Sequence, residues 1–211
     1  WKAWAKFCGL KLKRFIYLIS PKKINKNFYY NLSKVLSSRK IKFFQLRLKK
    51  VSKNKIIKIG RKIKKITKKF NVKLIINDSP QIAKKVNASG CHLGQLDSSI
   101  VYTRKLLKKK IIGITCHGSV KLVKKAIQNG PNYIAVGSFF KSKSKPNAKK
   151  ANTKIIKEIK KKTKIPVVAI GGINDKNYKK LIRKGANYIA ISSFIWNNPS
   201  LKPETAIKRF K

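Results

Sequence analysis

The sequence predicts an α/β fold in which eight parallel strands alternate with helices. Three observations support this prediction. Short β-branched runs recur about every 25 residues between positions 15 and 187, and Lys-rich segments with helical periodicity lie between them. Several of the runs are continuously apolar, as strands covered on both faces require. With 211 residues and 42% hydrophobic residues, the chain is large enough to build one substantial core.

The predicted strands share a short run of β-branched and aromatic residues. They are 15–20, 41–48, 72–77, 90–93, 111–116, 132–137, 165–170 and 187–192. Eight regular units favour a sheet closed into a (βα)8 TIM barrel with an outer ring of helices. A doubly wound open sheet is the alternative, although such sheets rarely contain eight regular units.

The segments between the strands carry helix signals. In 52–70, the residues Ile56, Ile59, Ile63 and Ile66 recur at helical spacing, and Ser52 precedes them as an N-cap. Segments 130–140 and 185–195 nearly repeat each other, which indicates two equivalent strands of one barrel. Since no Gly/Ser-rich or Pro-rich linker divides the chain, we predict an N-terminal extension at 1–14 and one catalytic barrel domain at 15–211.

The charge of the chain is extreme. Lys and Arg number 55 against 5 acidic residues, for a formal net charge of +50. Only 7 of these are Arg, the residue that base readout and bidentate phosphate contacts favour, and no nucleic-acid-binding motif is visible. Abundant Lys, Asn and Ile are typical of an AT-rich genome. We therefore expect no nucleic-acid partner beyond unspecific attraction of charge.

Cellular location is constrained by two absences in the sequence. No apolar run approaches the ~20 residues that span a bilayer, so we expect no membrane partner. Cys8, Cys91 and Cys116 have no CxxC spacing, which excludes a disulfide scaffold and a cysteine zinc site. We expect a cytoplasmic protein, and the sequence leaves open whether it forms a homo-oligomer.

Two of the five carboxylates follow successive predicted strands. In a parallel barrel, residues that follow the strands gather at one rim, where Asp78 and Asp97 would lie near Arg47 and Lys49. Paired carboxylates beside cations predict a Mg²⁺ site that also takes phosphate oxygens. The alternative is an ordinary surface ion pair, which contributes little to stability.

Other polar residues are predicted at the same rim. Gly171-Gly172, with a helix predicted to begin near Asn174, could cradle a second phosphate, or could simply form a tight turn. We expect Asp175 at the N-terminus of that helix, His92 packed in the core, and no Cys116–His117 nucleophile pair. The remaining rim candidates are Gln45, Asn77, Thr115, Ser142, Ser144, Lys145, Ser192 and Ser193.

Several motifs together resemble the thiamine-phosphate synthase/TenI superfamily. They are QLRLK (45–49), LIINDSPQIAKKVNASGCHLGQLD (74–97), IIGITCHGSVKLVKKAIQNG (111–130), NYIAVGSFFKSKSK (132–145) and VVAIGGI (167–173). The resemblance extends from about residue 15 to the C-terminus. The combination of the QxRxK motif with the ND…HLGQxD pair is specific, whereas AIGGI occurs in many barrels.

The resemblance implies a Mg²⁺-dependent enzyme that uses small phosphorylated substrates. It would join 4-amino-2-methyl-5-(diphosphooxymethyl)pyrimidine to 4-methyl-5-(2-phosphooxyethyl)thiazole by a dissociative route, giving thiamine phosphate and pyrophosphate. Asp78 and Asp97 would hold the metal, and Arg47, Lys49 and Lys145 would be the catalytic residues. The implied ligands of the pyrimidine pyrophosphate are Gln45, Arg47, Lys49, Asn77, Thr115 and Lys145. The implied ligands of the thiazole phosphate are Ser142, Ser144, Gly171, Gly172, Ser192 and Ser193.

The chain departs from the family pattern at a few positions. Ser142-Lys143-Ser144 replaces a common Thr-x-Thr, and Thr115 replaces Ser, so hydroxyl groups are kept at both places. Ser20-Pro21 replaces Thr-Asp, which removes the family's usual residues there. The related thiazole tautomerases use a His near the position of Ser138 and lack much of the pyrophosphate set. The synthase is therefore favoured over a tautomerase and over a non-catalytic basic RNA-binding barrel.

Overall fold

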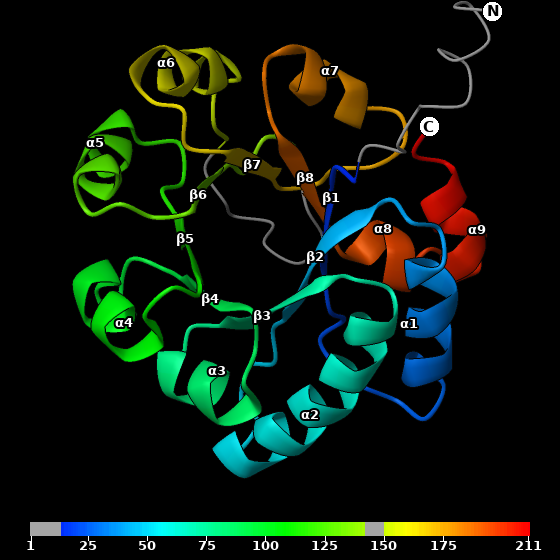
Figure 1. Cartoon of the computed structure of the whole chain (residues 1–211). Coiled ribbons are helices and arrows are strands. Elements are labelled where there is room, and N and C mark those ends of the chain that lie inside the picture. The colour runs from blue at the N-terminus through cyan, green and yellow to red at the C-terminus, as the bar shows by residue number, and fades with distance from the viewer. Residues whose placement is uncertain (1–13, 142–149) are drawn as a thin grey trace, which may run out of the picture.

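The computed structural model describes residues 14–141 and 150–211, which form a closed barrel of parallel strands (Figure 1). Strands β1 to β8 pair in chain order, and β8 pairs with β1 through Ile16–Ile189, Tyr17–Ala190 and Leu18–Ile191. This closure confirms the (βα)8 TIM barrel and excludes the open doubly wound sheet. The predicted strands are all present, each with ends within two residues of the predicted ones. The strands are β1 (Ile16–Ile19), β2 (Ile41–Leu46), β3 (Lys73–Asn77), β4 (Gly90–Leu93), β5 (Ile111–Thr115), β6 (Tyr133–Val136), β7 (Val167–Ile170) and β8 (Tyr188–Ile191).

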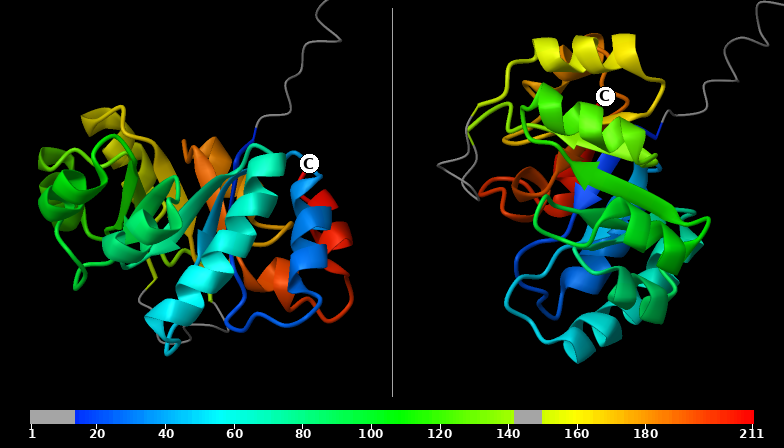
Figure 2. Two further views of the ribbon diagram at one scale, coloured as in Figure 1. Left: turned by 60° about the horizontal axis from the view of Figure 1, so that its bottom comes forward. Right: turned by 90° about the vertical axis from the view of Figure 1, so that its left-hand side faces the viewer.

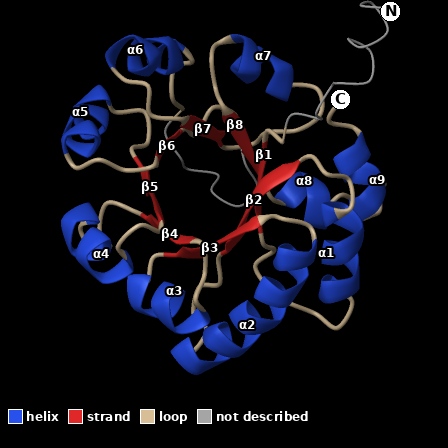
Figure 3. Ribbon diagram, viewed as in Figure 1, coloured by secondary structure: helices blue, strands red, loops and turns tan. Residues whose placement is uncertain are grey.

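The helices surround the strands as an outer ring (Figure 3), and two further views show them on the outside of the barrel (Figure 2). Two short helices follow β8, and the second of them lies beside the first helix of the chain, which completes the ring. The helices are α1 (Phe28–Leu36), α2 (Lys53–Lys69), α3 (Pro80–Val86), α4 (Ile100–Leu107), α5 (Val120–Gln128), α6 (Lys154–Lys162), α7 (Tyr178–Arg183), α8 (Ser193–Trp196) and α9 (Pro203–Lys208).

Helix α2 shows how the Lys-rich segments fold. The Ser52 side chain accepts a hydrogen bond from the backbone N–H of Lys55, which confirms the predicted N-cap. The buried face of the helix centres on Ile57, Gly60 and Ile63, while the other predicted isoleucines pack along its flanks. Gly60 sits at this centre because a Cβ there would lie 3.0 Å from a methyl group of Val86. The predicted apolar stripe is therefore correct in kind but displaced by about one residue.

The core has two parts. A large apolar layer lies between the barrel and the helices, and a smaller cluster fills the barrel interior. Three aromatic rings, Tyr17, Phe43 and Tyr133, occupy the interior with centroids 5.5–5.8 Å apart. Gly113 makes room for them, since a Cβ at that position would lie 1.9 Å from Cζ of Tyr133. The interior is packed with side chains and forms no pore.

No helix within residues 14–141 and 150–211 combines the length and the apolar character that a membrane crossing needs.

Thr103 in α4 yields a test of how the barrel is stabilised. Its fully buried Oγ1 is the one buried side-chain polar atom among the described residues without a hydrogen-bond partner. Replacing the hydroxyl by a methyl group in Thr103→Val removes this unsatisfied group and keeps the shape. We expect the free energy of unfolding to rise by about 1 kcal/mol, measured by urea denaturation.

Thr67→Val provides the matched control. Thr67 is equally buried in α2, but its Oγ1 donates to the carbonyl oxygen of Lys64 at 3.1 Å. The Thr67 variant should lose stability. An equal loss in both variants would show that Thr103 makes a contribution that its contacts do not reveal.

Candidate active site

Five of the predicted rim residues belong to or follow strand ends at the carboxyl end of the barrel. Gln45 belongs to β2, and Arg47 and Lys49 follow it; Asn77 ends β3, and Thr115 ends β5. Because all the strands are parallel, these ends open onto the same side. Gln45 is buried inside the barrel, Arg47 is half-buried and Lys49 is exposed, so this stretch leads from the interior to solvent.

Asp78 is fixed by its backbone. Its φ of 66° places it in the left-handed region, which Asp tolerates better than most residues, and its N–H donates to the carbonyl oxygen of His92 at 2.7 Å. The side chain then forms an ion pair with Lys49, whose Nζ donates to Oδ2 of Asp78. Asp78 thus takes part in an ion pair, but this ion pair does not account for the neighbouring carboxylate, and the Mg²⁺ site stays a prediction.

Asp97 lies next to Asp78, as the sequence predicted. Its Oδ2 accepts a hydrogen bond from the backbone N–H of Gly94 at 2.6 Å, which closes the turn after β4. Partial burial raises the pKa of Asp97, and the Asp78 carboxyl within hydrogen-bonding reach raises it further, against the opposing effects of Gly94 and Lys49. The Asp78 carboxyl is therefore held close enough to disfavour the charge of Asp97.

This pair of carboxylates fits a magnesium ion. A divalent cation would relieve the repulsion that raises the pKa of Asp97. The described residues hold no group of three or more His, Cys, Asp or Glu side chains suited to a metal. The remaining ligands would have to be water and substrate oxygens, which is the coordination that Mg²⁺ commonly adopts.

Ser20 organises the rim, a role that was not predicted from the sequence. This buried residue follows β1, and its Oγ accepts from the Arg47 N–H at 3.0 Å and lies 3.3 Å from the Arg47 carbonyl oxygen. Its own carbonyl oxygen accepts from the Ser192 hydroxyl at 3.1 Å. Ser20 thereby joins the ends of β1, β2 and β8. Ser192 follows β8 as predicted, but its hydroxyl proton is donated to the Ser20 carbonyl oxygen. A phosphate bound beside Ser192 would therefore need hydrogen bonds from other donors.

The Gly171-Gly172 turn packs against the segment that follows β6. Both residues have positive φ, 107° and 61°, and the Phe140 N–H donates to the carbonyl oxygen of Gly171 at 3.1 Å. A Cβ on Gly171 would lie 2.0 Å from Oγ of Ser138, and one on Gly172 would lie 2.2 Å from the carbonyl oxygen of Lys141. Glycine is therefore required here for the turn and its packing, whether or not a ligand binds.

The helix predicted to begin near Asn174 is wrong, because α7 begins at Tyr178. Oδ1 of Asn174 accepts hydrogen bonds from the N–H groups of Lys176 and Asn177, which forms a local turn in place of the first helical turn. Asp175 lies within this turn and is not at a helix N-terminus, so that expectation is also wrong. The N-terminus of α7 therefore does not lie directly after the glycines, where it was predicted to help bind a phosphate.

Three of the predicted site residues lie outside the described part of the structure. Ser142, Ser144 and Lys145 fall within residues 142–149, outside the described part of the chain. Ser193 is exposed and begins α8, directly after Ser192. Of the residues predicted to bind the thiazole phosphate, the structure therefore describes Gly171, Gly172, Ser192 and Ser193.

His92 is buried, as expected, and it also takes part in polar contacts that the sequence did not predict. Its ring stacks on Tyr133 with centroids 5.6 Å apart, and its nitrogens contact the hydroxyls of Tyr133 and Thr115. Burial lowers the pKa of His92 to about 4, so the ring is neutral near pH 7.

The expectation that Cys116 and His117 form no nucleophile pair agrees with their environments. Cys116 is buried and His117 is exposed. Burial raises the pKa of the Cys116 thiol to about 12, which keeps it protonated.

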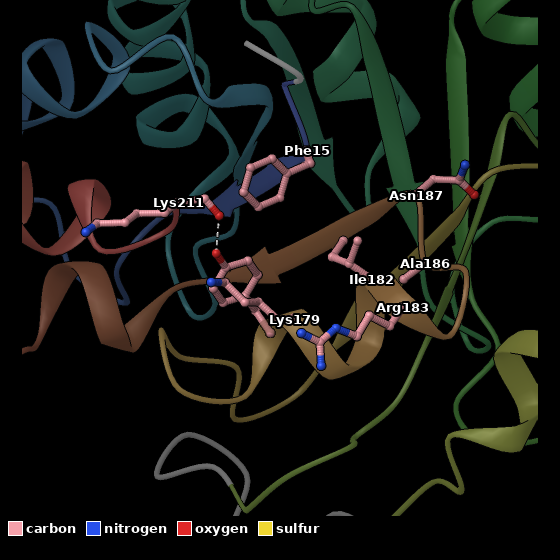
Figure 4. A pocket seen from close by; sticks show the side chains of 8 residues that line it. Phe15, Lys179, Ile182, Arg183, Ala186, Asn187 and Lys211 are labelled. Atoms are coloured by element: carbon pink, nitrogen blue, oxygen red, sulfur yellow. Dashed lines mark hydrogen bonds between the residues drawn. The ribbon is translucent and has the colours of Figure 1, made fainter. Parts of the chain in front are cut away.

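A separate pocket of about 260 Å³ lies at the opposite end of the barrel (Figure 4). Phe15 and Asn187, which directly precede β1 and β8, line it together with Tyr178 and Arg183 of α7. The hydroxyl of Tyr178 donates to the carbonyl oxygen of Lys211 across this pocket. The amino ends of barrel strands usually serve stability, so we place the candidate active site at the other rim.

The parallel barrel, with paired carboxylates and cationic side chains at its carboxyl end, has the architecture of a TIM-barrel enzyme, whose active site lies at that end. The family profile described as thiamine monophosphate synthase matches residues 16–195, and the chain belongs to this family. A thiamine-phosphate synthase of Pelagibacter ubique is 56% identical over 201 residues, which cover 94% of this chain and 97% of the relative. One of Clostridium acetobutylicum is 35% identical, with 91% and 92% covered.

One solved structure agrees with this family, and another shares only the fold. A thiamine phosphate pyrophosphorylase from Pyrococcus furiosus superposes with a TM-score of 0.83 at 25% identity, and 96% of each chain is covered. A 3-hexulose-6-phosphate synthase from Salmonella typhimurium reaches a TM-score of 0.67 at 13% identity, covering 92% of this chain and 96% of that one. The second similarity shows the barrel fold alone.

Asp97 gives a prediction about the cost of pairing two carboxylates. In Asp97→Asn the side-chain oxygen can still accept from the Gly94 N–H, but the charge facing Asp78 is removed. Without added metal, the variant should be as stable as the original protein or more stable, by no more than about 1 kcal/mol, in thermal unfolding at pH 7. Added Mg²⁺ should stabilise the original protein and leave the variant unaffected. A large loss of stability in the variant without metal would contradict the repulsion.

His92 gives a prediction about pH. Because folding lowers its pKa from 6.5 to about 4, the unfolded chain takes up the proton first as the pH falls. Stability associated with neutral His92 is complete above about pH 6.5 and is lost as the pH falls toward 4, by on the order of 3 kcal/mol. Urea unfolding between pH 7 and pH 4.5 measures this slope. His92→Gln should flatten the slope, whereas replacement of exposed His117 by Asn should not; equal slopes in all three proteins would contradict the assignment.

Proposed function

We propose that the chain catalyses the condensation of 4-amino-2-methyl-5-(diphosphooxymethyl)pyrimidine with 4-methyl-5-(2-phosphooxyethyl)thiazole. The observation that carries this proposal is that Asp78, Asp97 and Lys49 lie together at one rim of the barrel. Arg47, which follows β2, belongs to the same rim. Family membership supplies the substrates, because the curated relatives are thiamine-phosphate synthases. We propose the cytoplasm as its compartment, consistent with the unpaired Cys91 and Cys116.

The reaction breaks one bond and forms another. The bond from the pyrimidine methylene carbon to the pyrophosphate oxygen breaks, and pyrophosphate leaves with the electron pair. The lone pair of the thiazole ring nitrogen then forms the new C–N bond, which gives thiamine phosphate with a positively charged thiazolium ring. No proton has to be removed, so the site needs stabilisation of charge more than a general base.

Arg47 and Lys49 supply positive charge for the departing pyrophosphate in this proposal. Ser20 holds the Arg47 backbone just after β2, and Lys49 reaches Asp78. Asp78 and Asp97 would hold the Mg²⁺ ion, and a bound Mg²⁺ ion would neutralise charge on the pyrophosphate oxygens. Gln45, Asn77 and Thr115 would orient the pyrimidine pyrophosphate from the ends of β2, β3 and β5.

The thiazole phosphate belongs, in this proposal, to the neighbouring part of the rim. Gly171, Gly172, Ser192 and Ser193 follow the adjacent strands β7 and β8, where phosphate sites of such barrels commonly lie. Ser142, Ser144 and Lys145 remain predictions from the sequence, and Lys145 would add a third catalytic cation. The two anionic substrates would thus approach from neighbouring arcs of one opening.

The direct test supplies both substrates with Mg²⁺ and measures thiamine phosphate and pyrophosphate. Asp78→Asn should lower kcat/KM by about 100-fold or more while the fold persists, because Asn tolerates the left-handed backbone at this position but lacks the charge. Glu158→Gln is the matched control, since it removes an exposed carboxylate on α6. Full activity of Asp78→Asn would contradict the metal assignment.

Removal of the metal separates the alternatives. Chelation by EDTA should abolish product formation, and added Mg²⁺ should restore it. Isomerisation of a thiazole phosphate without release of pyrophosphate would identify a tautomerase. Folded protein that forms no thiamine phosphate from the two substrates and Mg²⁺ would overturn the proposed function.

A further inference from the structure

A chain of side-chain hydrogen bonds crosses the barrel interior from β2 to β5. Nε2 of Gln45 donates to the Tyr17 hydroxyl at 3.1 Å, and the Tyr17 and Tyr133 hydroxyls lie 2.7 Å apart. The Tyr133 hydroxyl lies 2.8 Å from Nδ1 of His92, and Nε2 of His92 lies 2.7 Å from Oγ1 of Thr115. Four members of the chain are buried, and half-buried Thr115 is its end at the mouth.

The position of each proton follows from counting donors and acceptors. The Tyr17 oxygen accepts from Gln45, so the one Tyr17 proton is available for Tyr133. Tyr133 then accepts from Tyr17, and its own proton goes to Nδ1 of His92. Nδ1 of His92 accepts this hydrogen bond and so carries no proton of its own. The ring proton is therefore on Nε2 and is donated to Oγ1 of Thr115.

The opposite direction is disfavoured. If Thr115 donated to His92, then His92 would donate to Tyr133 and Tyr133 to Tyr17. With the Gln45 amide nitrogen facing Tyr17, the Tyr17 proton would then meet a donor and find no acceptor among these side chains. A buried donor without an acceptor costs about 1–3 kcal/mol, which favours the first direction.

The members of the chain have little freedom to move. The ring of Tyr133 is 1% exposed, stacks on His92 and contacts the rings of Tyr17 and Phe43. Gly113 leaves the space that this ring fills, since a Cβ there would lie 1.9 Å from it. The tyrosine hydroxyls are therefore held in place by packing as well as by hydrogen bonds.

We propose that Tyr17 and Tyr133 are positioning residues that fix His92 as the Nε2–H tautomer and leave the Thr115 hydroxyl proton free to point outward. Thr115 can then donate this hydroxyl proton to a bound molecule. The identity of its acceptor rests on the proposed function, in which it is an oxygen of the pyrimidine pyrophosphate. The interior of the barrel thereby adds a directed donor to a site otherwise supplied by charged side chains.

Nitrogen NMR of the free protein tests the direction of the chain. The protein contains two His residues, so ¹⁵N-histidine labelling gives a simple spectrum, and His117→Asn assigns its signals. We expect Nε2 of His92 to show the shift of a protonated ring nitrogen and Nδ1 that of an unprotonated one. The reverse pattern would overturn the proposal. Tyr133→Phe removes the donor to Nδ1, so the two shifts of His92 should move toward each other.

Enzyme kinetics test whether Tyr133 acts through Thr115. Tyr133→Phe should lower kcat/KM about 10- to 100-fold, the cost of a misdirected hydrogen bond to a charged group. In a Thr115→Val background the same substitution should have no further effect, because the hydroxyl that it directs is gone. Tyr188→Phe is the control, since Tyr188 contacts the same interior cluster but lies outside the chain.

Equal effects of Tyr133→Phe in both backgrounds would mean that Tyr133 acts through packing, which would overturn the positioning role. The NMR measurement needs no substrate, so it can fail while thiamine phosphate is still formed. Conversely, an Nε2–H tautomer in a protein that forms no thiamine phosphate would leave the hydrogen-bond chain standing and remove the proposed function.

Discussion

Asp78 and Asp97 lie together at the mouth of the barrel although their charges repel, and the backbone keeps them there. The Asp78 N–H is bonded to β4 in a left-handed conformation, and Asp97 is tied to the turn at Gly94. Closure of the parallel sheet brings the ends of β3 and β4 side by side, so the two turns have no freedom to separate. Burial and this repulsion together raise the pKa of Asp97, and a divalent cation would relieve the repulsion. In the proposed function, the location of the Mg²⁺ ion and the arrangement of both substrates depend on this constraint.

The surroundings of this pair are strongly positive. A chain with a net charge of +50 attracts anions from every direction, and two anionic substrates would be drawn to it without a dedicated channel. Charge alone does not choose where they bind. In the proposed function the carboxylates provide that choice, because with a bound Mg²⁺ ion they would form a site for pyrophosphate oxygens that exposed ammonium groups elsewhere on the surface do not provide. The scarcity of acidic residues thus makes Asp78 and Asp97 more informative than they would be in an ordinary protein.

Much of the fold could be predicted from the sequence, because local patterns determine it. The regular spacing of apolar runs identified the eight strands, and the order of these strands placed Asp78, Asp97, Arg47 and Lys49 at one rim. The start of α7 was predicted wrongly, because Asn174 forms a side-chain turn that competes with a helix. Ser20, Tyr17 and Tyr133 were missed for a different reason. Tyr17 and Tyr133 are 116 residues apart, and Ser20 and Ser192 are 172 apart, so only the closed barrel brings them into contact.

The account depends most directly on whether the rim binds magnesium and pyrophosphate as a unit. Calorimetric titration with inorganic pyrophosphate, with and without Mg²⁺, measures this in the original protein and in Asp78→Asn. We expect Mg²⁺ to tighten pyrophosphate binding to the original protein, and we expect the variant to retain only the weaker binding that its cationic side chains provide. Equal affinity with and without Mg²⁺, or an undiminished effect of Mg²⁺ in Asp78→Asn, would contradict the account.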